Sequence, residues 1–253
     1  MQKYYSLKVD STDEDDIPIA KMGSKIISLH ETSKPEKARK MITSDKYDIL
    51  PLPFVPRANM NIRYFLCGTS GSGKSTLASK ILEEYARMYP KQKIYIFSAI
   101  DHDPAYDDNK VLKNKIQRID IRENLSDIEV QDFSNSFCVF DDCGSMNAQQ
   151  HKMLQKLKDM ILSTGRHSCV DSCVIRQDLL GGKESKADHM QSHFLGYFPG
   201  VGNDEELHYT FDKKYHYGKQ LIKDKLMGGS SRWCVLHKHV PRYLIQANKV
   251  ELL

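Results

Sequence analysis

The chain has 253 residues, of which 40% are hydrophobic and 28% are charged, so it is long and apolar enough to bury a sizeable core. This composition excludes pervasive disorder, a collagen-like repeat and a disulfide-dense miniature scaffold. No run approaches the roughly 18 consecutive apolar residues of a transmembrane helix, and residues 1–16 lack the apolar region of a secretory signal. The six cysteines form no C-x-x-C pair, so we expect reduced thiols, a reducing compartment and no membrane partner.

The net charge of +4 is unevenly distributed along the chain. Residues 213–249 carry nine lysines and arginines against a single acid, Asp224, whereas the rest of the chain carries 28 basic and 32 acidic side chains. All of the net positive charge therefore lies in this C-terminal basic segment. Such an asymmetry indicates a polyanionic partner, and nucleic acid is the first candidate.

Residues 1–57 are predicted to form a short N-terminal appendage. The elements expected within it are strands at 4–9 and 25–29 and a charged helix at 34–46. Pro51, Pro53 and Pro56 break any regular element, so we interpret 51–57 as an extended lead-in to the main domain. The main domain is predicted to span 58–253 and to include the basic segment.

From residue 61 onwards, short apolar strands alternate with amphipathic helices. The expected strands are 62–67, 93–99, 116–121, 137–140, 172–176, 194–198, 232–236 and 242–246. The expected helices are 74–89, 126–133 with Ser126 as its cap, and 147–163 with Asn147 as its cap. This alternation predicts an α/β fold, with a mostly parallel sheet covered by helices on both faces.

A phosphate-binding loop is predicted between the first of these strands and the first helix. The segment Gly68-Thr-Ser-Gly-Ser-Gly-Lys74-Ser75 fits the pattern G-x-x-x-x-G-K-[ST], in which glycines let backbone N–H groups face a phosphate at a helix N-terminus. We expect Lys74 to contact the β- and γ-phosphates of ATP and Ser75 to ligate Mg²⁺. The predicted nucleotide-binding residues are Gly68, Thr69, Ser70, Gly71, Ser72, Gly73, Lys74, Ser75 and Thr76.

Two acids follow the apolar strand 137–140. Asp141 and Asp142 are expected at the carboxyl edge of the sheet, beside the phosphate loop. We predict that Asp141 holds the magnesium ion and that Asp142 is the general base for hydrolysis, because two neighbouring carboxylates shift each other's titration. The run 141–144 also fits the D-x-x-G of GTPases, but 248–251 only approximates the N-K-x-D that a GTPase needs.

At least one expected strand, 93–99, lies between the two motifs. An extra strand between the phosphate-loop strand and the acid strand is typical of ATPases with a RecA-like fold. Further along the chain, Gly165-Arg166-His167 precedes a strand that ends at Gln177. In this order, the motifs of residues 60–200 resemble the FtsK/HerA superfamily of DNA-pumping ATPases. The Asp-Asp pair and the Gly-Arg-His step are most similar to its viral branch, the poxvirus-type genome-packaging ATPases of large DNA viruses and virophages.

The resemblance implies further roles. Gln177 matches the polar sensor that orients the attacking water or detects the γ-phosphate, and Arg166 matches an arginine finger that reaches a neighbouring subunit's nucleotide. Two departures from the family pattern leave alternatives open. The second acid is Asp142 where the superfamily prefers glutamate, and Arg176, directly before Gln177, is a rival finger.

Together these observations predict an ATP-hydrolysing, Mg²⁺-dependent motor that forms a homo-oligomeric ring. Its predicted partners are double-stranded DNA, bound without sequence preference, and a capsid component. As a viral protein it would act in the host cytoplasm or viral factory and could enter the virion. The alternatives are a helicase or recombination-type ATPase on single strands, a nucleotide-dependent assembly scaffold with little hydrolysis, and a small-molecule phosphotransferase.

Overall fold

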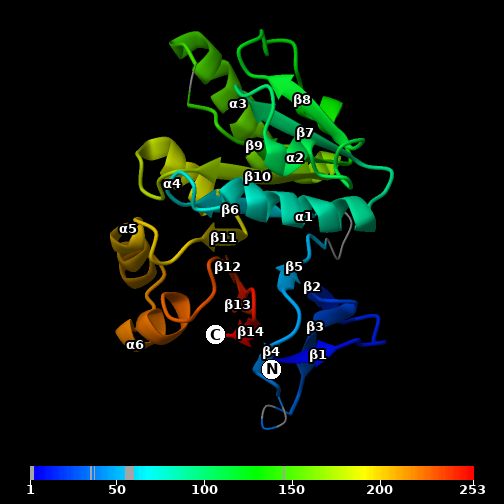
Figure 1. Ribbon diagram of the computed structural model, residues 1–253, viewed down its shortest axis with the longest axis vertical. Coiled ribbons are helices and arrows are strands. Elements are labelled where there is room, and N and C mark those ends of the chain that lie inside the picture. Colours follow the sequence, from blue (N-terminus) through cyan, green and yellow to red (C-terminus); the bar gives the residue numbers. More distant parts are fainter. Residues whose placement is uncertain (1–2, 35, 37, 55–59, 145) are drawn as a thin grey trace. The chain divides into compact units, whose positions relative to one another are not determined.

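The computed structural model describes residues 3–34, 36, 38–54, 60–144 and 146–253. The chain divides into two compact units, one made of Met1–Phe54 together with Phe194–Leu253 and the other of Val55–His193 (Figure 1). The site motifs lie in the second of these, which we call the central unit. The first is called the terminal-segment unit.

Among its described residues, the central unit has five parallel strands. In chain order they are β6 (Arg63–Cys67), β7 (Lys93–Ser98), β8 (Ile116–Asp120), β9 (Ser136–Phe140) and β10 (Val170–Arg176). Their order in the sheet is β6-β10-β9-β7-β8. The parallel α/β arrangement predicted from the alternation of strands and helices is therefore confirmed for this unit.

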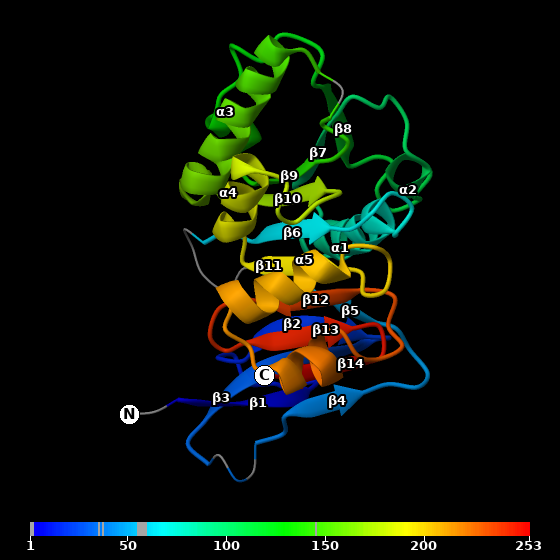
Figure 2. The same ribbon diagram turned by 90° about the vertical axis from the view of Figure 1, so that its left-hand side faces the viewer.

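Helices cover both faces of this sheet, as the apolar character of its strands requires. They are α1 (Lys74–Met88), the short α2 (Pro104–Asp107), α3 (Ala148–Thr164) and α4 (Lys183–Gln191) (Figure 2). On one face, the ring of Tyr85 from α1 packs edge-on against Phe137 of β9, with centroids 5.0 Å apart. On the other, His189 of α4 lies 5.7 Å from the ring of Phe65 in β6.

The strand order brings the predicted motifs to one edge. β10 lies between β6 and β9, with Arg176 opposite Cys67 and Val174 opposite Phe140. Because parallel strands end at the same edge of a sheet, the residues that follow β6, β9 and β10 emerge side by side there. The strand that separates the phosphate-loop strand from the acid strand is thus β10, which carries Gln177 at its end. β7 lies beyond β9.

The terminal-segment unit is built from antiparallel strands. One sheet has the order β1-β3-β2-β5, with β1 (Tyr4–Val9), β2 (Ile17–Met22), β3 (Lys25–Thr32) and β5 (Ile49–Pro51). The other runs β4-β14-β13-β12-β11, with β4 (Met41–Thr43), β11 (Phe194–Tyr197), β12 (Cys234–His237), β13 (Tyr243–Gln246) and β14 (Lys249–Leu252). Its short helices are α5 (Asp204–Tyr209) and α6 (Lys219–Leu221), each continued by a π-helical turn.

Several local expectations change in the structure. The division into units differs from the predicted boundary at 57/58, because β4 pairs with β14 and so joins the two ends of the described chain in one unit. The helix expected over 34–46 is wrong where β4 forms. The helix expected from Ser126 is a 3₁₀ turn, Val130–Phe133, capped by Glu129. Of the predicted lead-in 51–57, residues 55–57 lie outside the described residues.

Candidate functional site

The phosphate loop joins β6 to α1 with the backbone that its glycines permit. Gly71 and Gly73 have φ values of 75° and 104°, in the left-handed region that glycine adopts without steric cost. Gly73 is the N-cap of α1, and no side chain of the described chain caps that helix. The first N–H groups of α1 are therefore available to an anion at the end of the helix where its dipole is positive.

Lys74 is folded over this loop. Its Nζ donates hydrogen bonds to the carbonyl oxygens of Gly68 (2.8 Å) and Thr69 (2.9 Å). Burial lowers the pKa of Lys74, while the nearby charges of Asp141 and Asp142 oppose that shift. The ammonium group is thus held at the loop by weak neutral acceptors, which a phosphate oxygen can replace.

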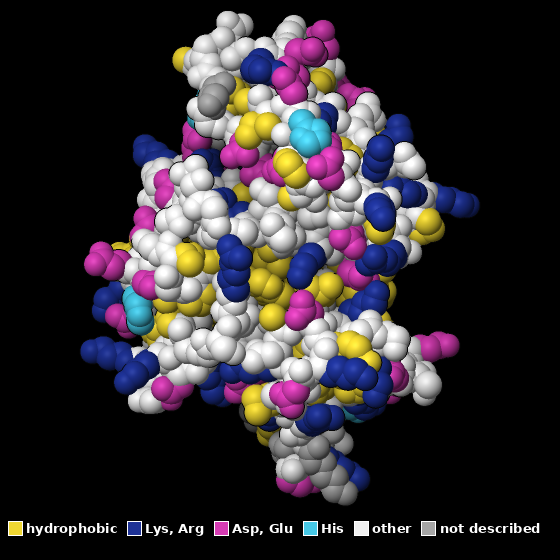
Figure 3. Space-filling view, viewed as in Figure 1, with side chains coloured by type: hydrophobic (Ala, Val, Ile, Leu, Met, Phe, Trp, Pro, Cys, Tyr) yellow, Lys and Arg dark blue, Asp and Glu magenta, His cyan; other side chains and the backbone are white. Residues whose placement is uncertain are grey.

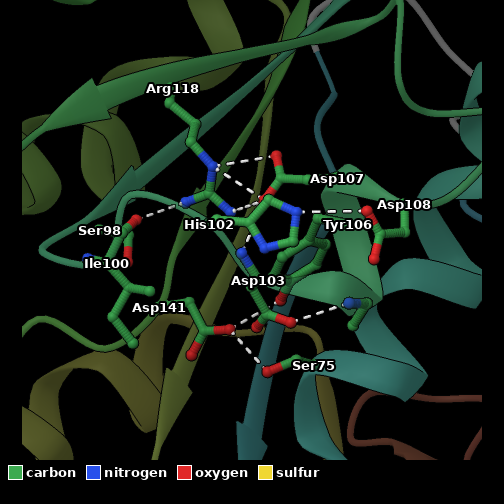
Figure 4. A network of polar contacts seen from close by, with 11 residues as sticks. Ser75, Ser98, Ile100, His102, Asp103, Tyr106, Asp107, Asp108, Arg118 and Asp141 are labelled. Atoms are coloured by element: carbon green, nitrogen blue, oxygen red, sulfur yellow. Dashed lines mark hydrogen bonds and ion pairs between the residues drawn. The ribbon is translucent and has the colours of Figure 1, made fainter.

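Asp141 is the most buried of the predicted site residues that carry a charge, at 4% exposure. Its Oδ2 accepts hydrogen bonds from the Ser75 hydroxyl (3.0 Å) and from the Tyr106 hydroxyl (2.7 Å), as Figure 4 shows. Its Oδ1 accepts one from the backbone N–H of Asp142 (3.0 Å). Burial is the main cause that raises the pKa of Asp141. The negative charge of Asp142 adds to this, and the bonds from Tyr106 and Ser75 oppose it.

A set of oxygen atoms suited to magnesium surrounds this position. The carboxylates of Asp103, Asp141 and Asp142 each offer an oxygen within 4.8 Å of the others, and Ser75 is hydrogen-bonded to Asp141. Mg²⁺ prefers oxygen ligands and is usually held by one or two carboxylates together with phosphate oxygens. The residues present therefore fit the magnesium ion that the phosphate loop implies, with Ser75 and Asp141 as its holders.

A cavity of about 470 Å³ opens beside the loop, at the carboxyl edge of the sheet. Lys74, Asp141, Asp142 and Gln177 all line it, so the structure brings these predicted residues together. Asp142 is exposed and has a left-handed backbone, with φ 50°. Its carboxylate can therefore face solvent within the cavity, as a group that accepts a proton from water must.

The two candidate arginine fingers lie in different places. Arg166 is exposed and precedes β10, whereas the phosphate loop follows the parallel strand β6, so Arg166 lies at the opposite edge of the sheet. Arg176 lines the cavity, but its guanidinium is bound within the chain. It donates from Nε (2.9 Å) and Nη2 (2.8 Å) to Asp188, a buried carboxylate that also accepts from Lys158 Nζ (2.6 Å).

Three residues near the site were not found from the sequence: Asp103, Tyr106 and Asp188. Asp103-Pro104 carries a recognisable signal, because Asp is a preferred N-cap and proline a preferred first helical residue. The Asp103 carboxylate indeed accepts a hydrogen bond from the Ala105 N–H (2.8 Å) at the start of α2. Tyr106 and Asp188 had no sequence signal, since their partners lie far away in the chain.

No protein-family model matches the chain. A curated protein that it resembles comes from a virophage. The chain is 25% identical to the uncharacterized protein V3 of Sputnik virophage over 263 aligned positions, which cover 100% of both chains.

Solved structures that the chain resembles include a viral genome-packaging NTPase, that of Sulfolobus turreted icosahedral virus 2. In complex with sulfate it is 15% identical, covering 76% of this chain and 96% of that one at a TM-score of 0.48. Its complex with ATP-gammaS is 14% identical, with the same coverage and a TM-score of 0.46. The pCW3 conjugation coupling protein TcpA with ATPgS is 11% identical, covering 92% of this chain and 76% of that one at a TM-score of 0.45.

Within the described ranges, every helix is too short or too polar to cross a bilayer.

Proposed function

We propose that this protein is an ATP-hydrolysing DNA translocase that works as a ring and packages double-stranded viral DNA into a capsid. The observation that carries the ATPase part is the hydrogen bond from Ser75 of the phosphate loop to Asp141. Asp142 and Gln177 line the cavity beside that loop. A phosphate loop, a buried carboxylate bonded to its serine, and a second exposed carboxylate are the groups that hydrolysis of a nucleoside triphosphate requires.

In this proposal each side chain has one task. The N–H groups at the start of α1 and the Lys74 ammonium bind the phosphates, and Lys74 exchanges its two carbonyl acceptors for phosphate oxygens. Ser75 and Asp141 hold the magnesium ion, which supplies positive charge to the transferring phosphoryl group. Asp142 accepts a proton from the attacking water, and Gln177 orients that water. The products are ADP and phosphate.

The position of Arg166 supports the proposed ring. An exposed arginine at the opposite edge of the sheet cannot serve its own phosphate loop, but it can enter the site of a neighbouring copy. Arg176 is committed to Asp188 within its own chain, so Arg166 is the better candidate for a finger that acts between subunits. A finger supplied in trans contributes about 10³-fold or more to hydrolysis.

DNA binding is assigned to the basic segment 213–249 of the terminal-segment unit. Lys219, Lys223 and Arg232 are exposed there, whereas Trp233 and Tyr243 are buried. Exposed basic side chains beside buried Trp and Tyr rings suit the phosphate backbone of a duplex better than unpaired bases, and the exposed rings of the segment are the imidazoles of His216 and His239. Tyr209, just before the segment, is an exposed exception at 53%. Figure 3 shows one face of the molecule, on which lysine and arginine side chains are interspersed with acidic ones.

The test is steady-state ATP hydrolysis with and without duplex DNA, at low and moderate salt, with Lys74→Ala as the blank. We expect the duplex to stimulate hydrolysis and salt to weaken that stimulation, because binding through phosphates releases counterions. Stronger stimulation by a single-stranded oligonucleotide would favour a helicase. Binding of Mg·ATP without any DNA stimulation would contradict the translocase and favour an assembly scaffold.

Two charge-matched variants sharpen the test. Replacing Lys219, Lys223 and Arg232 together with alanine should raise the DNA concentration needed for half-maximal stimulation and flatten its salt dependence. The control replaces Lys91, Lys93 and Lys113, which are exposed in the central unit, and should behave like the parent. If both triple variants needed the same increase in DNA concentration for half-maximal stimulation, net charge and not the basic segment would govern DNA binding.

Arg166→Ala tests the ring. We expect this variant to lose hydrolysis and to recover part of it when mixed with Lys74→Ala subunits, because each supplies the group that the other lacks. Unchanged activity of Arg166→Ala alone would rule out a finger at this position.

A further inference from the structure

Tyr106 makes a contact that phosphate-loop chemistry does not require. Its side chain comes from α2, its exposure is 1%, and its hydroxyl donates to Asp141 Oδ2 at 2.7 Å. The Ser75 hydroxyl donates to the same oxygen at 3.0 Å, while the Asp142 N–H donates to the other, Oδ1, also at 3.0 Å. Donors from α2, α1 and the chain after β9 therefore hold both oxygens of this carboxylate. Figure 4 shows the two donors that share Oδ2.

The segment that carries Tyr106 is itself held on two sides. On one side, Arg118 of β8 donates from Nε to Asp107 Oδ1 (3.1 Å) and from Nη1 to the carbonyl of Ile100 (2.8 Å). On the other, Asn109 Nδ2 donates to Ser79 Oγ (3.1 Å) and Glu83 Oε1 (2.6 Å) of α1. The phenol is thus placed by two neighbouring elements before any nucleotide arrives.

A buried tyrosine needs some acceptor for its hydroxyl, and a backbone carbonyl would satisfy it. Here the acceptor is instead the carboxylate of Asp141, which also accepts a hydrogen bond from Ser75 of the phosphate loop. Without Tyr106, Oδ2 would keep the Ser75 hydroxyl as its donor, and the Asp142 N–H would hold only Oδ1. The terminal torsion of an acid is broad, so Oδ2 could then turn away from its observed position. The Tyr106 hydroxyl, as a second donor on Oδ2, restricts that movement.

We infer that Tyr106 is a positioning residue for Asp141, and that it holds the carboxylate in the orientation in which Asp141 and Ser75 together receive the magnesium ion of Mg·ATP. This inference rests on the proposed nucleotide site. Tyr106 acts through Asp141 and does not itself contact the nucleotide.

The experiment titrates Mg²⁺ against binding of the slowly hydrolysed analogue ATPγS, measured by isothermal calorimetry on the full chain. Tyr106→Phe removes only the hydroxyl. We expect it to need about 10-fold more Mg²⁺ for half-maximal binding, the effect of one lost hydrogen bond to a charged group. Binding in EDTA should stay at the parent's level, because the phosphate loop itself is unchanged.

Tyr85→Phe is the matched control. Tyr85 of α1 is also buried, its hydroxyl donates to Gln92 beyond the end of that helix, and neither residue lines the cavity. It should show the parent's Mg²⁺ dependence. In an Asp141→Asn background, Tyr106→Phe should add little, because the two residues act as one unit.

The outcomes separate the two claims. An unchanged Mg²⁺ dependence in Tyr106→Phe, with normal binding by the parent, overturns this inference alone. Equal weakening in Tyr106→Phe and Tyr85→Phe, or weakening that persists in EDTA, also overturns it by showing a structural role. A parent that binds no ATPγS at any Mg²⁺ concentration overturns the proposed function and this inference together.

Discussion

Replacing Asp171 with asparagine is expected to stabilise the central unit more at pH 8 than at pH 5. Asp171 lies buried in β10, and its Oδ1 accepts a hydrogen bond from the Ile62 N–H at 2.7 Å. Burial raises the pKa of Asp171 to about 7, and the bond from Ile62 opposes part of that shift. Asparagine has the same shape and keeps an oxygen that can accept from Ile62, but it carries no charge to bury.

The magnitude follows from linkage. The unfolded chain releases this proton near pH 3.8, whereas the folded chain keeps it until about pH 7. Between these values the folded state binds more protons, so the parent loses stability as pH rises. At 1.36 kcal/mol per pKa unit, the loss is about 1.6 kcal/mol by pH 5 and about 4 kcal/mol by pH 8. The advantage of Asp171→Asn should therefore grow by about 3 kcal/mol over this range and level off above it.

The assay is urea unfolding of both proteins at pH 5, 6, 7 and 8, followed by a probe in the central unit. Asp127→Asn, at an exposed position in the same unit, controls for the loss of one negative charge. A stability difference between Asp171→Asn and the parent that stays constant from pH 5 to pH 8 would refute the reasoning, because it would mean that Asp171 is ionised in the folded state throughout.

Three further predictions concern catalysis and stability. Asp142→Asn should lower the rate of single-turnover ATP hydrolysis about 100-fold or more. Nucleotide binding should persist, because asparagine tolerates the left-handed backbone at this position. An equal loss of nucleotide binding would contradict the role of Asp142 as the general base. Asp188→Ala leaves Lys158 and Arg176 without their shared carboxylate. It should lower the free energy of unfolding, measured in urea, by about 3–5 kcal/mol. An unchanged unfolding midpoint would show that this network does not stabilise the protein. Asn147→Ala removes the capping box at the start of α3 and should lower the free energy of unfolding by about 1 kcal/mol. An equal loss of stability in Gln149→Ala, at an exposed position of the same helix, would argue against a stabilising cap.

The central unit was largely predictable because its signals are local. The phosphate loop, the apolar strand before Asp141 and the Asn147 cap are each encoded within a few residues. The parallel order of the strands then places Gln177 beside them. Tyr106 could not be predicted, because its hydroxyl meets a carboxylate 35 residues away and depends on how α2 packs between α1 and β8.

The terminal segments were harder for the same physical reason. The strands at 4–9 and 25–29 were predictable because their apolar residues alternate or cluster, and the strand expected at 242–246 is confirmed as β13, which pairs with β12. β4 has only three residues, and the charged sequence around it favours a helix by composition. Its strand geometry comes from pairing with β14, which no local pattern encodes.

The pairing of β4 with β14 also has a consequence for synthesis. The partner of Met41–Thr43 is translated about two hundred residues later, after all of Val55–His193. At ribosomal rates of about 5–20 residues per second, this strand waits roughly 10–40 s for its neighbour. In that interval the pairings of β3 with β1 and β2, and the whole central unit, have time to form. The pairing of β4 with β14 is therefore among the last contacts that a nascent chain can form.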